Sequence, residues 1–248
     1  MDKPVRAQTP RSSGRAAPRA RAPVFAALDL GTNNCRLLMA VSDGAGGLRV
    51  VDGFSRIVRL GEGLAHTGRL SDAAMARAYQ ALSACAERIE ARGPVAVGCV
   101  ATQACRAAAN GQRFLDRVEK DLGLKFEVIS PEAEARLSVL GCTSLLEPEA
   151  EYAMIVDIGG GSTEVSWISP RDVIGAGLDP PLISWGTCPL GVVTLAEDDP
   201  EPDHDKEAWY ESLVTRLAES FARVGEAQHL RPAFADGRAH IIGTSGTV

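Results

Sequence analysis

The sequence predicts an α/β protein built from two similar halves that face one cleft. Its apolar pattern switches repeatedly between strand-like runs and helical spacing along the chain. An apolar strand followed by an aspartate and a glycine-containing turn occurs twice, at residues 26–33 and 154–162. Such an internal repeat indicates a duplicated fold. With 248 residues, 45% of them hydrophobic, the chain can bury one or two cores.

The first half opens with an expected meander of three strands. Three apolar runs are separated by short segments rich in Gly, Asn and Asp, the residues that favour tight turns between strands. The expected strands are residues 24–30, 35–41 and 48–58.

A helical region follows the meander. Ser71 is a suitable N-cap, and apolar residues follow it at helical spacing until Gly93 stops the pattern. Ser130 and Pro131 begin another well-capped helix, which we expect to run through Leu145. Between these two helices we expect a strand at 95–100, a helix at 112–122 and a strand at 125–129.

After residue 148 the pattern of the first half begins again. An apolar strand at 154–158 leads into a glycine-rich turn, and another apolar strand follows it. Near the end of the chain we expect a strand at 239–242 and a third turn at 243–247. These repeats place an N-terminal domain at residues 24–148 and a second domain at 149–248.

The three glycine-containing turns predict a phosphate site. A glycine directly after a strand lets consecutive backbone N–H groups approach phosphate oxygens, and a strand-end aspartate can hold Mg²⁺ beside them. One such turn would more often be a tight hairpin with a capping aspartate, whereas three together favour phosphate binding. The sequence contains neither a GxxxxGK[ST] Walker loop nor a GxGxxG dinucleotide turn.

Composition excludes several other classes of protein. Residues 1–23 carry six basic side chains and one acidic one, which predicts a disordered basic tail, a solvated leader more than a nucleic-acid tether. The rest is acidic, because the whole chain has a net charge of −6, and this argues against broad nucleic-acid binding. Six cysteines without a CxxC pair or secretory leader predict a cytoplasmic protein without disulfides. No apolar run approaches the roughly 20 residues that span a membrane.

Five motifs then carry a family resemblance. They are DLGTNN at 29–34, ATQACRAAANG at 101–111, ISPEAEAR at 129–136, DIGGGSTE at 157–164 and GTSGT at 243–247. Their order and spacing resemble the Ppx/GppA family of exopolyphosphatases and guanosine pentaphosphate phosphohydrolases. The resemblance covers residues 24–248 and implies two ribonuclease-H-like domains of the actin-like ATPase and sugar-kinase superfamily. Family chains continue beyond the GTSGT motif, so the second domain is expected to be incomplete.

Carried over residue by residue, the resemblance implies roles for individual side chains. Glu134 would be the base that deprotonates the attacking water. Asp157 and Glu164, with Asp29 across the cleft, match the family's Mg²⁺ site, and Arg106 would bind the terminal phosphate. The turn residues implied to bind phosphate are Gly31, Thr32, Asn33, Gly159, Gly160, Gly161, Ser162, Gly243, Thr244 and Ser245. Without the resemblance, spacing alone favours a helix-stabilising role for Glu134, and the other acids are typical of ordinary turn and strand-surface residues. Arg106 is then about as typical of a solvated helix arginine as of a phosphate ligand.

The function that the resemblance implies is magnesium-dependent hydrolysis of terminal phosphoanhydride bonds. The expected substrates are inorganic polyphosphate, guanosine pentaphosphate or both, with no membrane or nucleic-acid partner. One alternative is a truncated relative that binds these polyphosphates without efficient turnover. A second is phosphotransfer to a sugar or acid, which the water-activating Glu134 disfavours. The choice of substrate and the oligomeric state, a homodimer included, stay open at this point.

Overall fold

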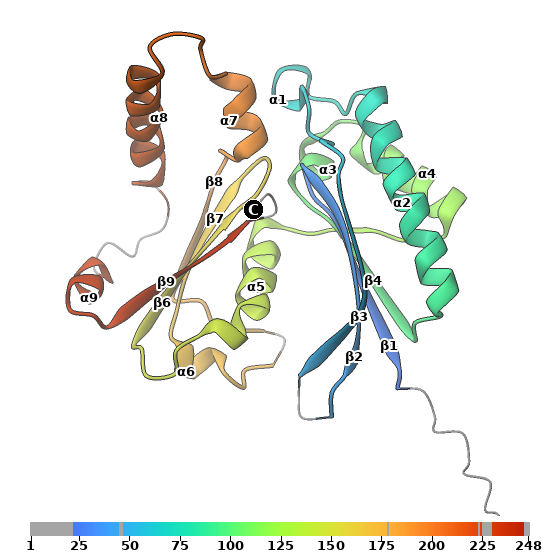
Figure 1. The fold of residues 1–248 in the computed structure, drawn as a ribbon, viewed down its shortest axis with the longest axis horizontal. Helices are drawn as coiled ribbons and strands as arrows, with labels where there is room; N and C mark the ends of the chain where they lie inside the picture. The colour runs from blue at the N-terminus through green and yellow to red at the C-terminus, as the bar shows by residue number, and fades with distance from the viewer. Residues whose placement is uncertain (1–21, 45–46, 178, 223, 225–229, 246–248) are drawn as a thin grey trace, which may run out of the picture.

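The computed structural model describes residues 22–44, 47–177, 179–222, 224 and 230–245. These residues form two β-sheets that lie side by side with helices around them (Figure 1). The first sheet has the strand order β3-β2-β1-β4-β5, and the second has the order β8-β7-β6-β9. This topology confirms the predicted α/β class with two similar halves. Of the predicted disordered tail, residues 1–21 lie outside the described residues.

The first sheet begins with the predicted meander. Strands β1, β2 and β3 pair antiparallel, and β4 joins β1 in parallel on its other side. Alternate residues of β1 are buried, as expected of a strand with one face against helices. The strands are β1 (Val24–Leu30), β2 (Asn34–Ser42), β3 (Leu48–Ile57), β4 (Ala96–Ala101) and β5 (Glu127–Val128).

Two helices, α2 (Asp72–Arg92) and α4 (Gly111–Leu122), cover the outer face of the first sheet (Figure 1). The α2 helix begins where predicted, because the Ala74 N–H donates to Ser71 Oγ at 3.2 Å. These helices and the sheet enclose one apolar core, in which Leu28 and Leu82 are almost wholly buried. The short helices α1 (Leu64–Thr67) and α3 (Gln103–Ala107) lie at the end of this half that carries the glycine turn.

The second sheet repeats the plan of the first. Its antiparallel strands are β6 (Tyr152–Ile158), β7 (Thr163–Ile168) and β8 (Ser184–Cys188), and β9 (Ala239–Ser245) runs parallel to β6. The register is also repeated, because Asp29 lies opposite Arg36 in the first sheet and Asp157 lies opposite Glu164 in the second.

The predicted turn at 243–247 is wrong at its first three residues. Gly243, Thr244 and Ser245 continue β9 and pair with Val156, Asp157 and Ile158 of β6. The strand runs on because β6 offers a partner as far as its last residue. Residues 246 and 247 lie outside the described residues.

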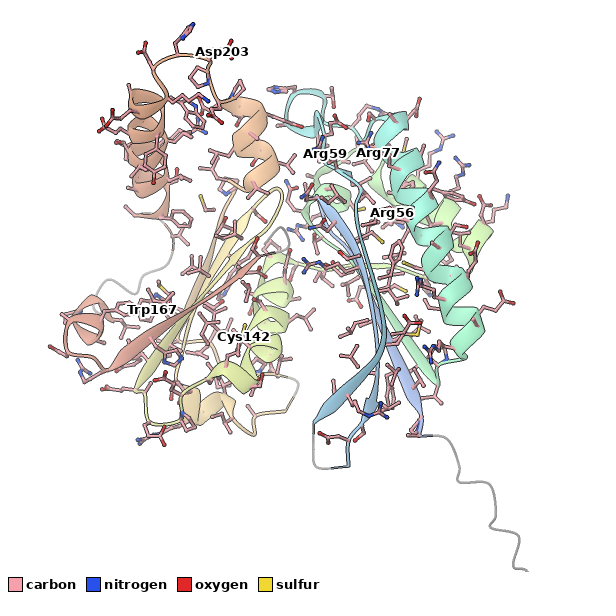
Figure 2. The ribbon with its side chains drawn as sticks, in the orientation of Figure 1. Arg56, Arg59, Arg77, Cys142, Trp167 and Asp203 are labelled. Atoms are coloured by element: carbon pink, nitrogen blue, oxygen red, sulfur yellow. The ribbon has the colours of Figure 1, made fainter. Side chains whose placement is uncertain are left out.

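Helix α5 (Pro131–Gly141) begins at the predicted Ser130 cap but packs against the second sheet. It ends at Gly141 and a short 3₁₀ turn, η1 (Thr143–Leu145), follows, instead of one helix through Leu145. Val139 and Cys142 are buried in the second core with Ile155, as the position of Cys142 in Figure 2 shows. The predicted domain boundary at residue 148 therefore falls after a helix that already belongs, by packing, to the second half.

The remaining helices surround the second sheet. They are α6 (Pro170–Val173), α7 (Val192–Asp198), α8 (Lys206–Phe221) and α9 (Arg231–Ala235). In the described part of the chain, no helix combines the length and apolar character needed to cross a membrane.

Candidate active site

Both aspartate–glycine turns open into one cleft between the two halves. The cleft has a volume of about 360 Å³. It is lined by most of the residues that the sequence singled out, namely Asp29, Gly31, Thr32, Asn33, Glu134, Asp157, Gly159, Gly160, Gly161, Ser162, Thr244 and Ser245. The repeat in the sequence thus corresponds to two turns that share one cavity.

The two turns touch each other directly. A Cβ atom on Gly160 would lie 2.9 Å from the backbone nitrogen of Asn33, closer than real Cβ contacts. Thr32 donates its hydroxyl hydrogen to Gln103 Oε1 at 3.1 Å, and both of these residues also lie beside Gly161. Glycine is needed here because the backbone of one half passes against the backbone of the other.

Glu134 lies in the first turn of α5 and reaches the cleft from the side of the second half. Its neighbour Arg106, on α3, donates from Nη1 to the carbonyl oxygen of Ile129 at 2.5 Å and lies 3.5 Å from Glu134 Oε2. Burial is the main cause that raises the pKa of Glu134 to about 7, and the charge of Glu164 raises it further, against the attraction of Arg106.

Asp29 has a similar environment on the opposite wall. Burial, opposed by Arg36 and assisted by Asp157, raises the pKa of Asp29 to about 6. Its Oδ1 atom is buried without a hydrogen-bond partner among the described residues. A buried carboxylate oxygen without a donor is a position where a cation or a ligand donor would be favourable.

Glu164, predicted as a metal ligand, lies behind the cleft wall. Its side chain is buried and accepts a hydrogen bond from Thr187 Oγ1 at 3.0 Å. Burial raises the pKa of Glu164, and hydrogen bonds from Ser162 and Thr187 oppose this rise. Glu164 nevertheless lies close enough to Glu134 for its charge to raise the pKa of Glu134.

The acidic side chains suit Mg²⁺, which prefers oxygen ligands and keeps several waters and phosphate oxygens as partners. Asp29 and Asp157 line the cleft, and Oδ1 of Asp29 is buried without a hydrogen-bond partner among the described residues. Within the described ranges, no three His, Cys, Asp or Glu side chains form a ready-made metal cluster. The carboxylates of Asp29 and Asp157 are the groups in the cleft that could hold such an ion.

Three predicted residues do not line the cleft: Arg106, Glu164 and Gly243. One residue that the sequence did not single out does line the cleft. It is Arg36, the single basic side chain among the described residues that line the cleft. Sequence reasoning passed over Arg36, although its place on β2 opposite Asp29 gave a signal. Alternation along β2 turns its side chain to the same face as that aspartate.

Fold and cleft together define an α/β protein with two similar halves and a glycine-lined cleft between them. The family model described as the Ppx/GppA phosphatase family matches residues 39–230, most of the chain. The chain belongs to this family.

Individual relatives agree with this assignment. Over 175 residues the chain is 35% identical to a guanosine-5'-triphosphate,3'-diphosphate pyrophosphatase of Photobacterium profundum, covering 71% of the chain and 33% of that relative. A Ppx/GppA family structure from Aquifex aeolicus is 30% identical with a TM-score of 0.63, covering 79% of this chain and 61% of that one. An exopolyphosphatase-like protein is 32% identical with a TM-score of 0.74, covering 90% of this chain and 66% of that one. The chain thus spans a third of the curated relative's length.

Proposed function

We propose that the protein hydrolyses terminal phosphoanhydride bonds and releases orthophosphate. The observation that carries this proposal is Glu134, a carboxylate with a pKa of about 7 in a cleft lined by two glycine turns. A group with a pKa near neutrality is half ionised at physiological pH and can accept a proton from water efficiently. Among the described residues that line the cleft, the other acids are Asp29 and Asp157, which lie on strands, whereas Glu134 lies on a helix.

In this mechanism the turns bind and Glu134 reacts. The N–H groups of Gly31 and Gly159 close their own turns by donating to Asn34 and Ser162, so the backbone N–H groups of Thr32 and of Gly160 to Ser162 would hold the phosphate chain. Arg36 would offset negative charge at the rim of the cleft. Glu134 would take a proton from the water that attacks the terminal phosphorus. Mg²⁺ bound by Asp157 and Asp29 would neutralise charge on the phosphate oxygens.

The proposed substrates are inorganic polyphosphate and guanosine pentaphosphate. The similarity to the Photobacterium guanosine-5'-triphosphate,3'-diphosphate pyrophosphatase supports the guanosine compound, and the similarity to the exopolyphosphatase-like protein supports the polymer. Both substrates present the same terminal phosphoanhydride to the cleft. We place the reaction in the cytoplasm, since all six cysteines are free and buried, as suits a reducing compartment.

A binding protein without efficient turnover is the second candidate. Arg106, expected to grip the terminal phosphate, instead lies beside Glu134 and donates to Ile129. An arginine held in this way stabilises the charged base and is unavailable to the substrate until it moves. This candidate shares the cleft and its ligands with the first and differs only in rate.

One assay separates the two candidates. Phosphate release is measured from polyphosphate, guanosine pentaphosphate and ATP, each with and without Mg²⁺. If the protein is a hydrolase, we expect orthophosphate release from polyphosphate or guanosine pentaphosphate, and we expect this release to stop without Mg²⁺. Binding of these substrates in calorimetry without any phosphate release would favour the second candidate.

The proposed ion site makes a separate prediction. In Asp157→Asn we expect hydrolysis to require a higher Mg²⁺ concentration, because one ligand of the ion is lost. A Mg²⁺ titration of the variant that overlays the titration of the parent would exclude Asp157 from the ion site.

A further inference from the structure

The first glycine turn is held from behind by the loop that follows β3. The carbonyl oxygen of Asn33 accepts hydrogen bonds from the backbone N–H groups of Val58, at 2.7 Å, and Arg59, at 2.9 Å. The carbonyl oxygen of Thr32 accepts a third from Gly61 at 3.0 Å. Because the loop binds the carbonyl side of the turn, the position of the loop fixes the position of the turn.

The second glycine turn is held in the same way by α7. Val192 donates its N–H to the carbonyl oxygen of Gly159 at 3.0 Å, and Val193 donates to that of Gly160 at 2.8 Å. These donors are the first N–H groups of the helix, which have no partner inside it. These hydrogen bonds tie the second turn to the first residues of α7.

Glu197 joins these two supporting segments. It lies near the end of α7, and its carboxylate accepts the backbone N–H of Gly63, with distances of 3.0 Å to Oε1 and 3.2 Å to Oε2. Gly63 lies in the first half, directly before α1, and Figure 1 places α1 and α7 next to each other at the same end of the molecule. The hydrogen bond therefore crosses between the two halves.

The loop that Glu197 grips is itself stiff. Arg77 of α2 donates from Nε to the carbonyl oxygen of Val58 at 2.9 Å and from Nη2 to that of Arg59 at 3.2 Å. Arg77 also pairs with Glu62, and Figure 2 shows Arg59 and Arg77 together at this end of the first half. Because these hydrogen bonds hold the loop, a displacement of Gly63 also displaces the first turn.

We propose that Glu197 is a positioning residue that holds the two phosphate turns against each other and fixes their alignment. The connected path runs from the first turn through the loop at 58–63 to Glu197, and through α7 to the second turn. A phosphate chain that contacts both turns binds best when their N–H groups are already spaced for it. The role in substrate binding rests on the proposed function, whereas the mechanical link does not.

The test compares Glu197→Ala with Glu197→Gln and with a matched control, Glu201→Ala. Gln keeps an oxygen that can accept the Gly63 N–H, whereas Ala removes the acceptor. Glu201 lies a few residues further along and pairs with Lys206, within the second half. Hydrogen exchange is followed in peptides covering 59–67 and 157–162, and inorganic tripolyphosphate binding is measured by calorimetry.

In Glu197→Ala we expect faster exchange in both peptides and about tenfold weaker tripolyphosphate binding, since a hydrogen bond to a charged group is lost. In hydrolysis, KM should rise by a similar factor with a smaller change in kcat. Glu197→Gln should recover most of both effects, and Glu201→Ala should match the parent. Parent-like affinity in Glu197→Ala, or parent-like exchange at 157–162, would overturn the proposal.

The two proposals fail in different ways. If the parent protein binds no tripolyphosphate, the proposed function is in error, and exchange at 157–162 still decides whether Glu197 positions the second turn. If the parent hydrolyses polyphosphate and the Ala variant equals it, only the role of Glu197 is in error.

Discussion

Glu134 is the side chain on which the proposed chemistry of the cleft depends. Replacing it with Gln keeps its size and removes its ability to take a proton. We expect Glu134→Gln to lower turnover by roughly 100-fold to 10,000-fold while phosphate binding stays near the parent value. The control is Glu132→Gln, because Glu132 lies on the same helix turn and pairs with the nearby Arg136. Unchanged turnover in Glu134→Gln would exclude Glu134 as the base.

The raised pKa of Glu134 also predicts opposite pH dependences of activity and stability. As the proposed base, Glu134 can accept a proton only when it is ionised, so kcat/KM should rise as the pH increases through about 7. The folded protein prefers the neutral carboxyl, so its contribution to stability is complete below the ordinary pKa of 4.5 and is lost as the pH rises through about 7.

Glu134→Gln should therefore unfold at a higher temperature than the parent at pH 8 and at nearly the same temperature at pH 4.5. The difference in unfolding free energy at pH 8 is on the order of 3 kcal/mol, since one pKa unit corresponds to about 1.4 kcal/mol. Thermal melts of both proteins from pH 4.5 to pH 8 measure it. Parallel curves for the two proteins would contradict the raised pKa.

Among the turns and helices, the contact between the two glycine turns makes the sharpest prediction. In Gly160→Ala the new methyl group would meet Asn33 at 2.9 Å and push the turns apart. We expect a loss of about 1 to 3 kcal/mol in unfolding free energy, together with weaker tripolyphosphate binding. Gly98→Ala is the control, because no described atom lies within 4 Å of a Cβ atom built there. Equal effects of the two substitutions would show that the turns are not in tight contact.

For the molecule as a whole, the symmetry of the two halves is broken by α5. This helix covers the face of the second sheet that carries Asp157, and it buries Ile155. The matching face of the first sheet carries Asp29 and borders an apolar cavity of about 700 Å³, lined by Leu38 and other residues. Leu38 is 47% exposed. One sheet is thus covered on this face and the other is open to the space between the halves.

The open face predicts unequal effects of two leucine substitutions in the first sheet. Leu38→Ser should change the unfolding free energy by no more than about 0.5 kcal/mol and should lower the fluorescence of a bound hydrophobic dye. Leu28→Ala, on the buried face, should cost about 2 to 5 kcal/mol, since Leu28 is 1% exposed. Chemical denaturation measures both values. A large loss in Leu38→Ser would show that this face is covered in solution.

Local patterns were enough to predict most elements and both turns. Ser71 and Ser130 begin α2 and α5 as expected, because a cap satisfies N–H groups within three residues of itself. The repeated aspartate and glycine at strand ends predicted the two turns at the cleft, because strand direction and turn geometry are set by neighbouring residues. The family followed from the same motifs, and the family model confirms it.

Only the tertiary structure decided which side chains reach the cleft and with what charge. The pKa of Glu134 depends on Glu164, Arg106 and Asp29, which three other segments bring to it. Arg36 lines the cleft and Arg106 turns to Ile129, although the sequence predicted Arg106 as the phosphate ligand. Burial and electrostatic interactions depend on distances in space between residues far apart in the chain, and no local pattern contains those distances. For the same reason the packing of α5 on the second sheet, and not its sequence, places Glu134 in one cleft with both turns.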